Sequence, residues 1–307
     1  MSSTSNNLWF IVGATSGFGL EIANQAIARG DQVGATSRKA TSSDKLQALE
    51  SKGALLLDLD ATSPDEFLRD AITKTTQHFG RNITYFINAV GYILEGAAEE
   101  ISAEEGLRSI TTNVLAVMNL SRIEAEHLRT TRPSSSGQSV PHHGGIANFG
   151  SLGSWKGGPA FSHYAAAKWA VTGFTESLHH ELAPFGIHAI VVEPGYFRTG
   201  FLNAGGGNRL FAEKQLIEAY KGTPVEFTKQ ALSKVDNNQP GDVVKGCKVI
   251  VDVLTGTGAA EGRKRTIRLV LGKDCVDAIR EKMAETEQYL QEWEDLITTT
   301  DHDDVHV

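Results

Sequence analysis

Short runs of consecutive apolar residues alternate along the chain with longer segments in which apolar residues recur every three or four positions. The short runs lie at 8–13, 32–37, 54–59, 83–88, 145–150, 188–193 and 266–271. The longer segments lie at about 17–30, 43–52, 64–79, 102–130, 162–183, 240–254 and 273–297. Continuous apolar runs are typical of strands buried on both faces, and a period near 3.6 is typical of helices. The alternation predicts an α/β fold with a doubly wound, parallel, seven-stranded sheet.

Composition and charge add limits on function. The chain has 307 residues, 40% of them hydrophobic, and a net charge of −8. This acidic balance argues against nucleic acid or an anionic membrane as a partner. No apolar run is long enough to span a bilayer, and the polar start "MSSTSNN" lacks the features of a secretory signal. Two cysteines, Cys247 and Cys275, form no disulfide framework. We expect one domain over 1–307 and a cytoplasmic location.

Two segments depart from the strand–helix rhythm. Residues 132–145 are rich in Ser, Gly and Pro, and residues 298–307 form a short acidic tail. No Asp, Glu or Cys near His142 and His143 in sequence would complete a metal site. We therefore expect a solvated loop, a frayed tail and no metal.

A glycine-rich turn follows the first predicted strand and leads directly into a helix. Its sequence, "GATSGFG", contains Gly13, Thr15, Ser16, Gly17, Phe18 and Gly19. Glycines let the backbone approach a pyrophosphate closely, and the first turn of a helix offers free N–H groups. The alternative is a tight turn without a ligand, but the strand before and the helix after favour a dinucleotide site.

The residues after the second strand predict which dinucleotide binds. An acidic side chain there would bind the adenosine ribose and repel a 2′-phosphate. The chain instead has Ser37 and Arg38, a hydroxyl and a guanidinium that suit a phosphate. NADP(H) is the expected cofactor, and the alternative is that Arg38 and Lys39 are solvated.

Tyr164 and Lys168 are separated by three alanines, so a helix places both on one face. An ordinary solvent-facing pair is the alternative reading. Beside a cofactor, however, a lysine cation favours the phenolate and is expected to lower the phenol's pKa from its usual value near 10. Such a tyrosine would exchange a proton with a carbonyl or alcohol oxygen.

Together these motifs resemble the short-chain dehydrogenase/reductase family over about 8–298. The glycine turn, "INAVG" at 87–91, "TTNVLAV", Ser151, the Tyr164–Lys168 pair and "EPGYFRT" at 193–199 follow the family's order. The C-terminal region is similar to the 17β-hydroxysteroid-dehydrogenase-like reductases of fungi and bacteria. The resemblance implies a single Rossmann-like domain and a homo-oligomer, commonly paired through helices such as 102–130 and 162–183.

The resemblance also implies roles for individual residues. Ser151 would bind the substrate oxygen, Tyr164 would transfer the proton and Lys168 would hold the nicotinamide ribose, with Asn113 supporting Lys168 through a water. Asn88 would stabilise the central strand and, with Gly91, border the cofactor. Further contacts to the cofactor would come from Asp60 and Ala61 at the adenine, and from Pro194, Gly195 and Thr199 at the nicotinamide. Val12, the sequence "NAVG" and Gly150 depart from the family pattern without removing a proton-transfer group.

These readings predict an NADPH-dependent reductase, reversible as a dehydrogenase, that transfers hydride to a ketone or aldehyde. Residues 196–235, with the Gly-rich "NAGGGNRLF", are expected to form a substrate lid. Trp155, Phe161, Tyr196 and Phe201 either line an apolar pocket for a bulky hydrophobic carbonyl of secondary metabolism or pack in the core. Two alternatives remain at this point: the scaffold performs isomerisation, dehydration or cyclisation, or the protein senses NADP(H) without catalysis.

Overall fold

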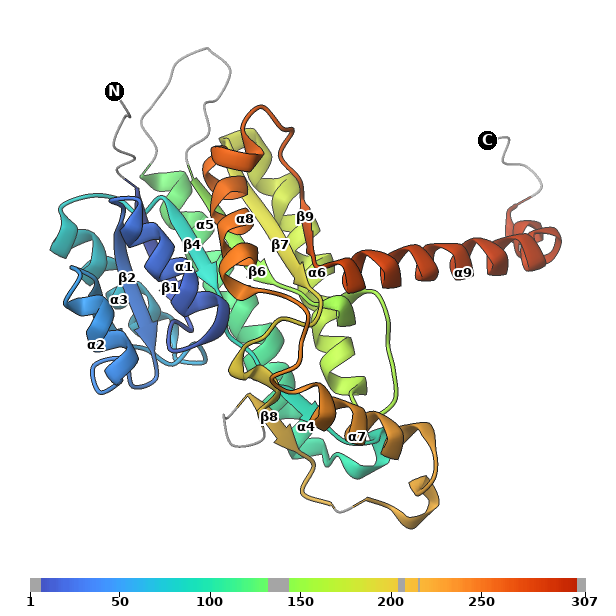
Figure 1. Cartoon of the computed structure of the whole chain (residues 1–307). Helices are drawn as coiled ribbons and strands as arrows, with labels where there is room; N and C mark the ends of the chain where they lie inside the picture. The colour runs from blue at the N-terminus through green and yellow to red at the C-terminus, as the bar shows by residue number, and fades with distance from the viewer. Residues whose placement is uncertain (1–6, 132–143, 204–207, 215, 303–307) are drawn as a thin grey trace.

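A computed structural model describes residues 7–131, 144–203, 208–214 and 216–302 of the chain. Its centre is a parallel sheet of seven strands in the order β3-β2-β1-β4-β6-β7-β9 (Figure 1). The strands are β1 (Leu8–Val12), β2 (Gln32–Ser37), β3 (Leu55–Asp58), β4 (Tyr85–Asn88), β6 (Gly144–Phe149), β7 (Ile187–Pro194) and β9 (Arg268–Leu271). The seven-stranded, doubly wound sheet predicted from the sequence is confirmed. The order reverses between β1 and β4, where folds of this type leave a crevice for a ligand.

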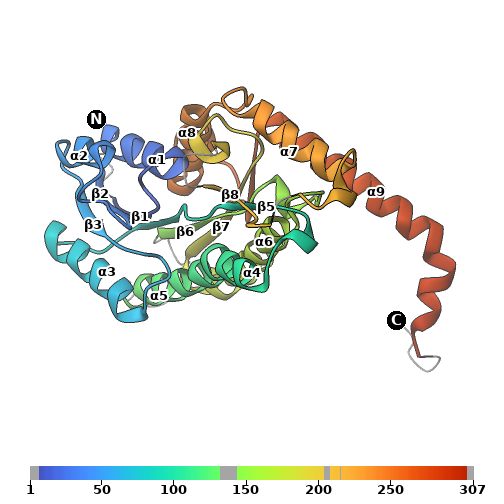
Figure 2. The same cartoon turned by 90° about the horizontal axis from the view of Figure 1, so that it is seen from below.

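Helices cover both faces of this sheet (Figure 2). One face carries α1 (Gly17–Ala28), α2 (Asp44–Glu50) and α8 (Val243–Thr255), and the other carries α3 (Asp65–Phe79), α5 (Ala116–Thr130) and α6 (Ser162–Leu182). The helix predicted from about residue 240 begins only at Val243, because the Asp242 carboxylate caps it by accepting hydrogen bonds from Val244 N and Lys245 N.

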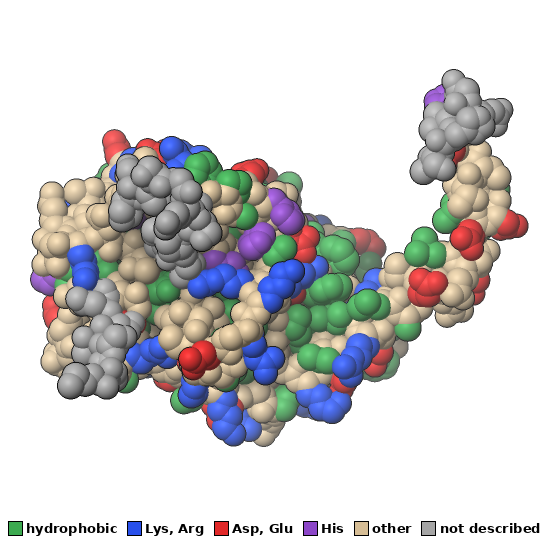
Figure 3. Space-filling view, turned by 90° about the horizontal axis from the view of Figure 1, so that it is seen from above, with side chains coloured by type: hydrophobic (Ala, Val, Ile, Leu, Met, Phe, Trp, Pro, Cys, Tyr) green, Lys and Arg blue, Asp and Glu red, His purple; other side chains and the backbone are tan. Residues whose placement is uncertain are grey.

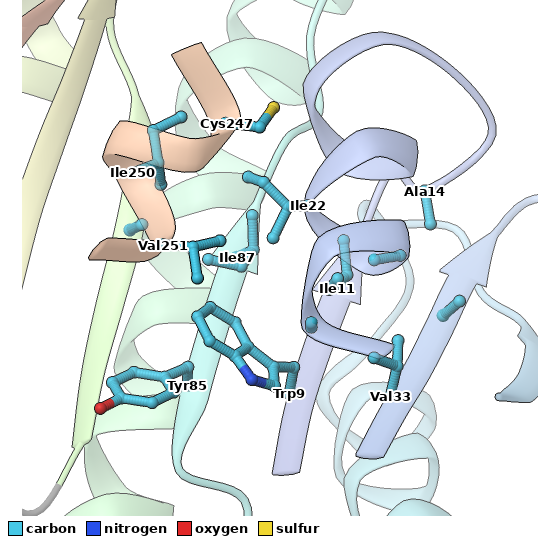
Figure 4. Packing of buried hydrophobic residues seen from close by; sticks show 14 of the residues in the cluster. Trp9, Ile11, Ala14, Ile22, Val33, Tyr85, Ile87, Cys247, Ile250 and Val251 are labelled. Atoms are coloured by element: carbon cyan, nitrogen blue, oxygen red, sulfur yellow. The ribbon is translucent and has the colours of Figure 1, made fainter. Parts of the chain in front are cut away.

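Strand β1 is apolar at every position because its side chains are buried on both faces of the sheet. Trp9 and Ile11 pack under α1 and α8, whereas Leu8 and Phe10 pack under α3 and α5. Figure 4 shows the first of these clusters, in which the rings of Trp9 and Tyr85 lie 4.5 Å apart between centroids. A strand covered on both faces must be apolar at every position, which is the pattern in the sequence.

A small lobe lies at the carboxyl edge of the sheet, and its helices and strands were not predicted individually from the sequence. It contains α4 (Ala103–Ile110), α7 (Pro224–Val235) and a two-stranded sheet of β5 (Ile93–Glu95) and β8 (Arg209–Phe211). The single helix predicted over 102–130 is interrupted here by a π-helical turn at Thr111–Leu115, which separates α4 from α5. Strands of three residues are too short to give a periodic signal.

Buried charges hold this lobe together. The side chains of Glu95 and Arg209 are each 2% exposed, and their charged atoms lie 2.7 Å apart. Arg209 also donates to the backbone oxygens of Leu202 and Lys229, so one guanidinium joins β5, β8 and α7. Glu100, five residues after Glu95, accepts hydrogen bonds from the Lys229 ammonium and from the backbone N–H of Ile217. The described part of the segment predicted as a lid is thus tied to residues 95–100.

Helix α9 (Lys273–Ile297) has the bounds expected from the sequence and leaves the body of the molecule (Figures 1 and 3). Its first turn packs at the sheet, where the Asp274 carboxylate accepts from the backbone N–H of Tyr196. Beyond that turn, Leu290 and Trp293 are more than half exposed. None of the described helices is both long and apolar enough to cross a membrane. The predictions for His142, His143 and residues 303–307 fall outside the described residues.

Candidate active site

A cavity of about 720 Å³ opens at the carboxyl ends of the sheet strands. Its wall contains residues at or just beyond the carboxyl ends of six strands: 13 and 15–19 at β1, 37–38 at β2, 59–62 at β3, 89–93 at β4, 149–153 at β6 and 194–197 at β7. The small lobe closes the opposite side with Leu202, Asn208, Leu210 and Leu232. This is the place where parallel α/β sheets bind ligands.

The glycine turn forms one end of the cavity. Gly13 has φ of +89°, and a Cβ there would lie 2.5 Å from the carbonyl oxygen of Ala89. A Cβ at Gly19 would lie 2.3 Å from the carbonyl oxygen of Gly13. Side chains are therefore excluded, and the backbone at the start of α1 faces the cavity. The side chain of Ser16 makes no capping hydrogen bond to α1, so the first backbone N–H groups of α1 are available to a phosphate. Thr15, Gly17 and Phe18 also line the cavity.

The structure distinguishes the two basic residues that follow β2. Arg38 lines the cavity and makes no hydrogen bond or ion pair with other described residues, whereas Lys39 lies outside the wall. Ser37 lines the same end, and its hydroxyl accepts from the N–H of Lys39 at 3.3 Å. Asp60 also lines the cavity, but its carboxylate accepts hydrogen bonds from the backbone and side chain of Thr62. The guanidinium is thus the free charged group at this end of the described wall.

Ser151, Tyr164 and Lys168 meet on the wall near the middle of the cavity. Ser151 follows β6, and its hydroxyl lies near the phenol of Tyr164: a Cβ at Gly153 would lie 3.7 Å from Ser151 Oγ and 3.4 Å from Tyr164 Cε1. Lys168 lies one helical turn farther along α6, with its Nζ 5.5 Å from the centroid of the Tyr164 ring. The Lys168 ammonium donates to the carbonyl oxygen of Phe149 at 2.8 Å. A proton-carrying phenol and a cation therefore share the cavity with the glycine turn.

Burial decides the protonation of this pair among the protein groups. Burial raises the pKa of Tyr164 to about 12, and the Ser151 hydroxyl opposes only part of that rise. Burial lowers the pKa of Lys168 to about 8, because the residue is only 4% exposed and forms no ion pair with a described carboxylate. Among the protein groups alone, desolvation decides the pKa of the phenol, and the lowering expected beside a bound cofactor stays a prediction. The phenol stays protonated at neutral pH.

Two predicted asparagines lie behind the wall instead of on it. Asn88 is completely buried and donates to Glu124 Oε2 at 2.8 Å and to Asn148 Oδ1 at 2.9 Å, so it links β4 to β6 and α5. Asn113, in the π-helical turn, exchanges hydrogen bonds with the backbone of Tyr92. A Cβ at Gly91, which lines the cavity, would lie 2.6 Å from Asn113 Oδ1 and 3.5 Å from Lys168 Nζ. Asn113 thus supports the backbone next to Lys168.

The remaining predicted residues divide in a similar way. Pro194, Gly195 and Thr199 line the cavity, as do Phe161, Tyr196 and Phe201. Trp155 does not, because its indole N–H donates to Glu193 and the Arg268 guanidinium stacks 3.7 Å from its ring centroid. Sequence reasoning missed Tyr92, Ile93, Arg108, Leu210 and Gln239 on the wall. These residues come from the small lobe and its connections, where no motif marks them.

Comparisons with known proteins agree with this geometry. A family model described as short chain dehydrogenase matches residues 7–206. The chain is 32% identical over 272 residues to the protein named Oxidoreductase BOA17 of Botryotinia fuckeliana, covering 88% of this chain and 90% of that protein. A crystal structure of a short-chain dehydrogenase from Streptomyces avermitilis has a TM-score of 0.81 and 31% identity, covering 97% of this chain and 100% of that one.

Two further structures share the fold and were solved with a dinucleotide. A short chain dehydrogenase/reductase from Burkholderia phymatum in complex with NAD has a TM-score of 0.74 and 18% identity, covering 94% of this chain and 97% of that one. A short chain dehydrogenase from Burkholderia cenocepacia in complex with NADP has a TM-score of 0.63 and 22% identity, covering 86% of this chain and 96% of that one. At identities of 18% and 22%, these two structures show a shared fold and nothing further.

Proposed function

This chain belongs to the short-chain dehydrogenase family, and from that premise we propose that it is an NADPH-dependent reductase of ketones or aldehydes, reversible as an alcohol dehydrogenase. The observation that carries the proposal is that the Ser151 hydroxyl and the Tyr164 phenol lie next to each other in a cavity that also contains the glycine turn. Proton transfer and dinucleotide binding therefore take place within one enclosed space. A purely sensing protein has no need for this hydroxyl pair.

The residues present fit an NADP(H) molecule. The glycine turn and the start of α1 would hold the pyrophosphate, and the free guanidinium of Arg38 with the hydroxyl of Ser37 would hold a 2′-phosphate. Lys168, beside Gly91, would hold the nicotinamide ribose. When bound, the reduced nicotinamide supplies the hydride.

The protein's own groups would handle the oxygen of the substrate. The Ser151 hydroxyl would donate to the carbonyl oxygen, and the Tyr164 phenol would give its proton to the same oxygen as negative charge develops there. A pKa near 12 keeps the phenol protonated at neutral pH, which is the form that reduction requires. The Lys168 cation, partly neutralised by burial, would stabilise the phenolate that remains.

The wall of the small lobe supports a hydrophobic substrate. Ile93, Phe161, Phe201, Leu202 and Leu210 all face the cavity. Apolar surface of this extent favours a bulky carbonyl compound over a small polar one. Turnover restricted to small polar carbonyls would contradict this part of the proposal.

The Tyr164→Phe variant tests the catalytic assignment. It keeps the ring and removes the proton, so we expect NADPH oxidation with a panel of ketones and aldehydes to fall by at least roughly a hundredfold. NADPH binding, followed by nucleotide fluorescence, should remain. Tyr92→Phe is the matched control, because Tyr92 is a second tyrosine on the cavity wall and its phenol is influenced by Ser109 and not by Ser151. Near-normal turnover by Tyr164→Phe would refute the assignment.

We also propose that the protein is a homo-oligomer. Leu107 on α4, Leu115 in the π-helical turn and Trp169 on α6 are 66%, 51% and 49% exposed, and each would lose apolar surface to water on pairing. They lie on the helices expected to pair. The Leu115→Arg/Trp169→Arg double variant should have a lower mass in sedimentation equilibrium than the unaltered protein, and a monomeric mass for the unaltered protein would contradict the proposal.

A further inference from the structure

Gln239 is a buried amide on the wall of the cavity with no use in the chemistry described above. Its residue exposure is 1%, and it lines the cavity beside Leu232 and Leu202. Neither Nε2 nor Oε1 has a hydrogen-bond partner among the described residues. The other buried side-chain amides among the described residues each make at least one hydrogen bond. The amide nitrogen of Asn148, for example, donates to Ser121 and Thr175.

The backbone around Gln239 is fixed, so the position of its side chain is imposed by the fold. The carbonyl oxygen of Gln239 accepts from the Arg198 guanidinium at 3.3 Å. Two residues on, Gly241 donates to the carbonyl oxygen of Tyr196 and accepts from the N–H of Arg198. The connection between α7 and α8 is therefore tied to residues 196–198, which follow β7 at the nicotinamide end of the cavity.

A buried amide without partners destabilises the free protein, because it has lost its hydrogen bonds to water and gained none. Such groups in folded proteins call for a reason, and a ligand that completes the hydrogen bonds is one. We propose that Gln239 is a specificity-determining residue that binds a hydroxyl group of the substrate, distant from the carbonyl that is reduced. This inference rests on the proposed reductase function and deepens it.

The chemistry of the wall selects the kind of group. The amide has an NH2 group that donates and a carbonyl oxygen that accepts, and a hydroxyl group can both accept from the first and donate to the second. A carboxylate would need a cation, but Arg209, the buried cation of the lobe, is already paired with Glu95. Arg108, which also lines the cavity, is paired with Glu213. The expected substrate is therefore a neutral, mainly hydrophobic ketone that carries a hydroxyl at its far end.

The test compares ω-hydroxyalkyl phenyl ketones of graded chain length with the n-alkyl phenyl ketones in which a methyl group replaces the hydroxyl. At the chain length that reaches Gln239, we expect the kcat/KM for the hydroxyl compound to exceed that for its methyl partner by at least about tenfold, since a site built for a hydroxyl rejects the analogue without it. The Gln239→Met variant, similar in shape but without hydrogen-bonding atoms, should lose this preference while still reducing the methyl compound.

A second readout does not depend on activity. Without ligand, Gln239→Met should unfold at a higher urea concentration than the unaltered protein, because it removes two unpaired buried polar atoms. Gln230→Met is the matched control: Gln230 is exposed on α7 and its amide donates to Glu226, so neither stability nor preference should rise.

The outcomes separate the two proposals. A less stable Gln239→Met variant, or a hydroxyl preference that survives in it, would overturn the role of Gln239. Equal reduction of both ketones at every chain length by the unaltered protein would also overturn it and leave the reductase in place. If neither ketone is reduced, the proposed function fails, and the unfolding comparison together with equilibrium binding of the two ketones still decides the role of Gln239.

Discussion

Glu124 lies on α5 in the middle of the core, and its carboxyl group makes the stability of this protein depend on pH. The side chain is 0% exposed, and its Oε2 accepts from Asn88 Nδ2 at 2.8 Å. Its Oε1 has no partner among the described residues, and no cation is hydrogen-bonded to the group. Burial raises the pKa of Glu124 from 4.5 to about 8, and the Asn88 amide offsets only part of the effect.

The direction of the pH dependence follows from the order of the two pKa values. The folded value lies above the unfolded one, so the folded protein binds the proton more tightly. The resulting stabilisation is complete below pH 4.5 and is lost as the pH rises towards 8. At about 1.36 kcal/mol for each pH unit, the free energy of unfolding falls by roughly 3.5 kcal/mol between about pH 5 and pH 8 through this group alone.

The Glu124→Gln variant removes the titrating group and keeps an amide oxygen to accept from Asn88. We expect urea unfolding at a fixed protein concentration to show a much flatter dependence on pH for this variant. The free energy of unfolding of the variant, relative to that of the unaltered protein, should rise by roughly 3.5 kcal/mol from about pH 5 to pH 8. This corresponds to a relative shift of about 1 M or more in the urea midpoint.

A control on the same helix has the opposite sign. Glu126 is hydrogen-bonded to Arg69, which lowers the pKa of Glu126, so its small contribution is present at high pH and is lost on acidification. Glu126→Gln should therefore not flatten the decline in stability above pH 5. If Glu124→Gln and the unaltered protein lose stability in parallel between pH 5 and pH 8, Glu124 is not a buried carboxylic acid and the reasoning is wrong.

The remaining predictions concern the cofactor and the small lobe. Arg38→Asp should lower the ratio of kcat/KM for NADPH to that for NADH by at least about a hundredfold, since one change removes a phosphate partner and adds a repelling charge. Lys39→Asp, the control, should change this ratio little. An unaltered ratio in Arg38→Asp would show that Arg38 does not select the cofactor. Glu95→Gln should lower the free energy of unfolding by about 3–5 kcal/mol, because it leaves the buried Arg209 guanidinium without its carboxylate. The exposed pair of Lys221 with Glu218 should cost less than about 1 kcal/mol when Glu218→Gln breaks it, and equal effects in the two urea titrations would contradict this account.

Repeating local patterns allowed the sheet to be predicted from the sequence. β1 is apolar at all five positions because helices cover both of its faces, and α6 and α9 carry continuous helical periods. The glycine turn was readable for the same reason, since Gly13 and Gly19 have no room for a Cβ in a strand–turn–helix unit. The fold class and the cofactor end of the cavity are thus consequences of short-range sequence.

Contacts between distant segments decided the rest. The pKa of Tyr164 among the protein groups depends on how deeply the phenol is buried, which the four-residue spacing to Lys168 does not reveal. Asn88 and Asn113 carry family motifs, yet packing places them behind the wall. Gln239, with no motif around it, lies on the wall because residues 196–198 hold its backbone there. Local sequence determines elements and turns, whereas burial, charge pairing and the shape of a cavity are sums over segments that only the folded chain brings together.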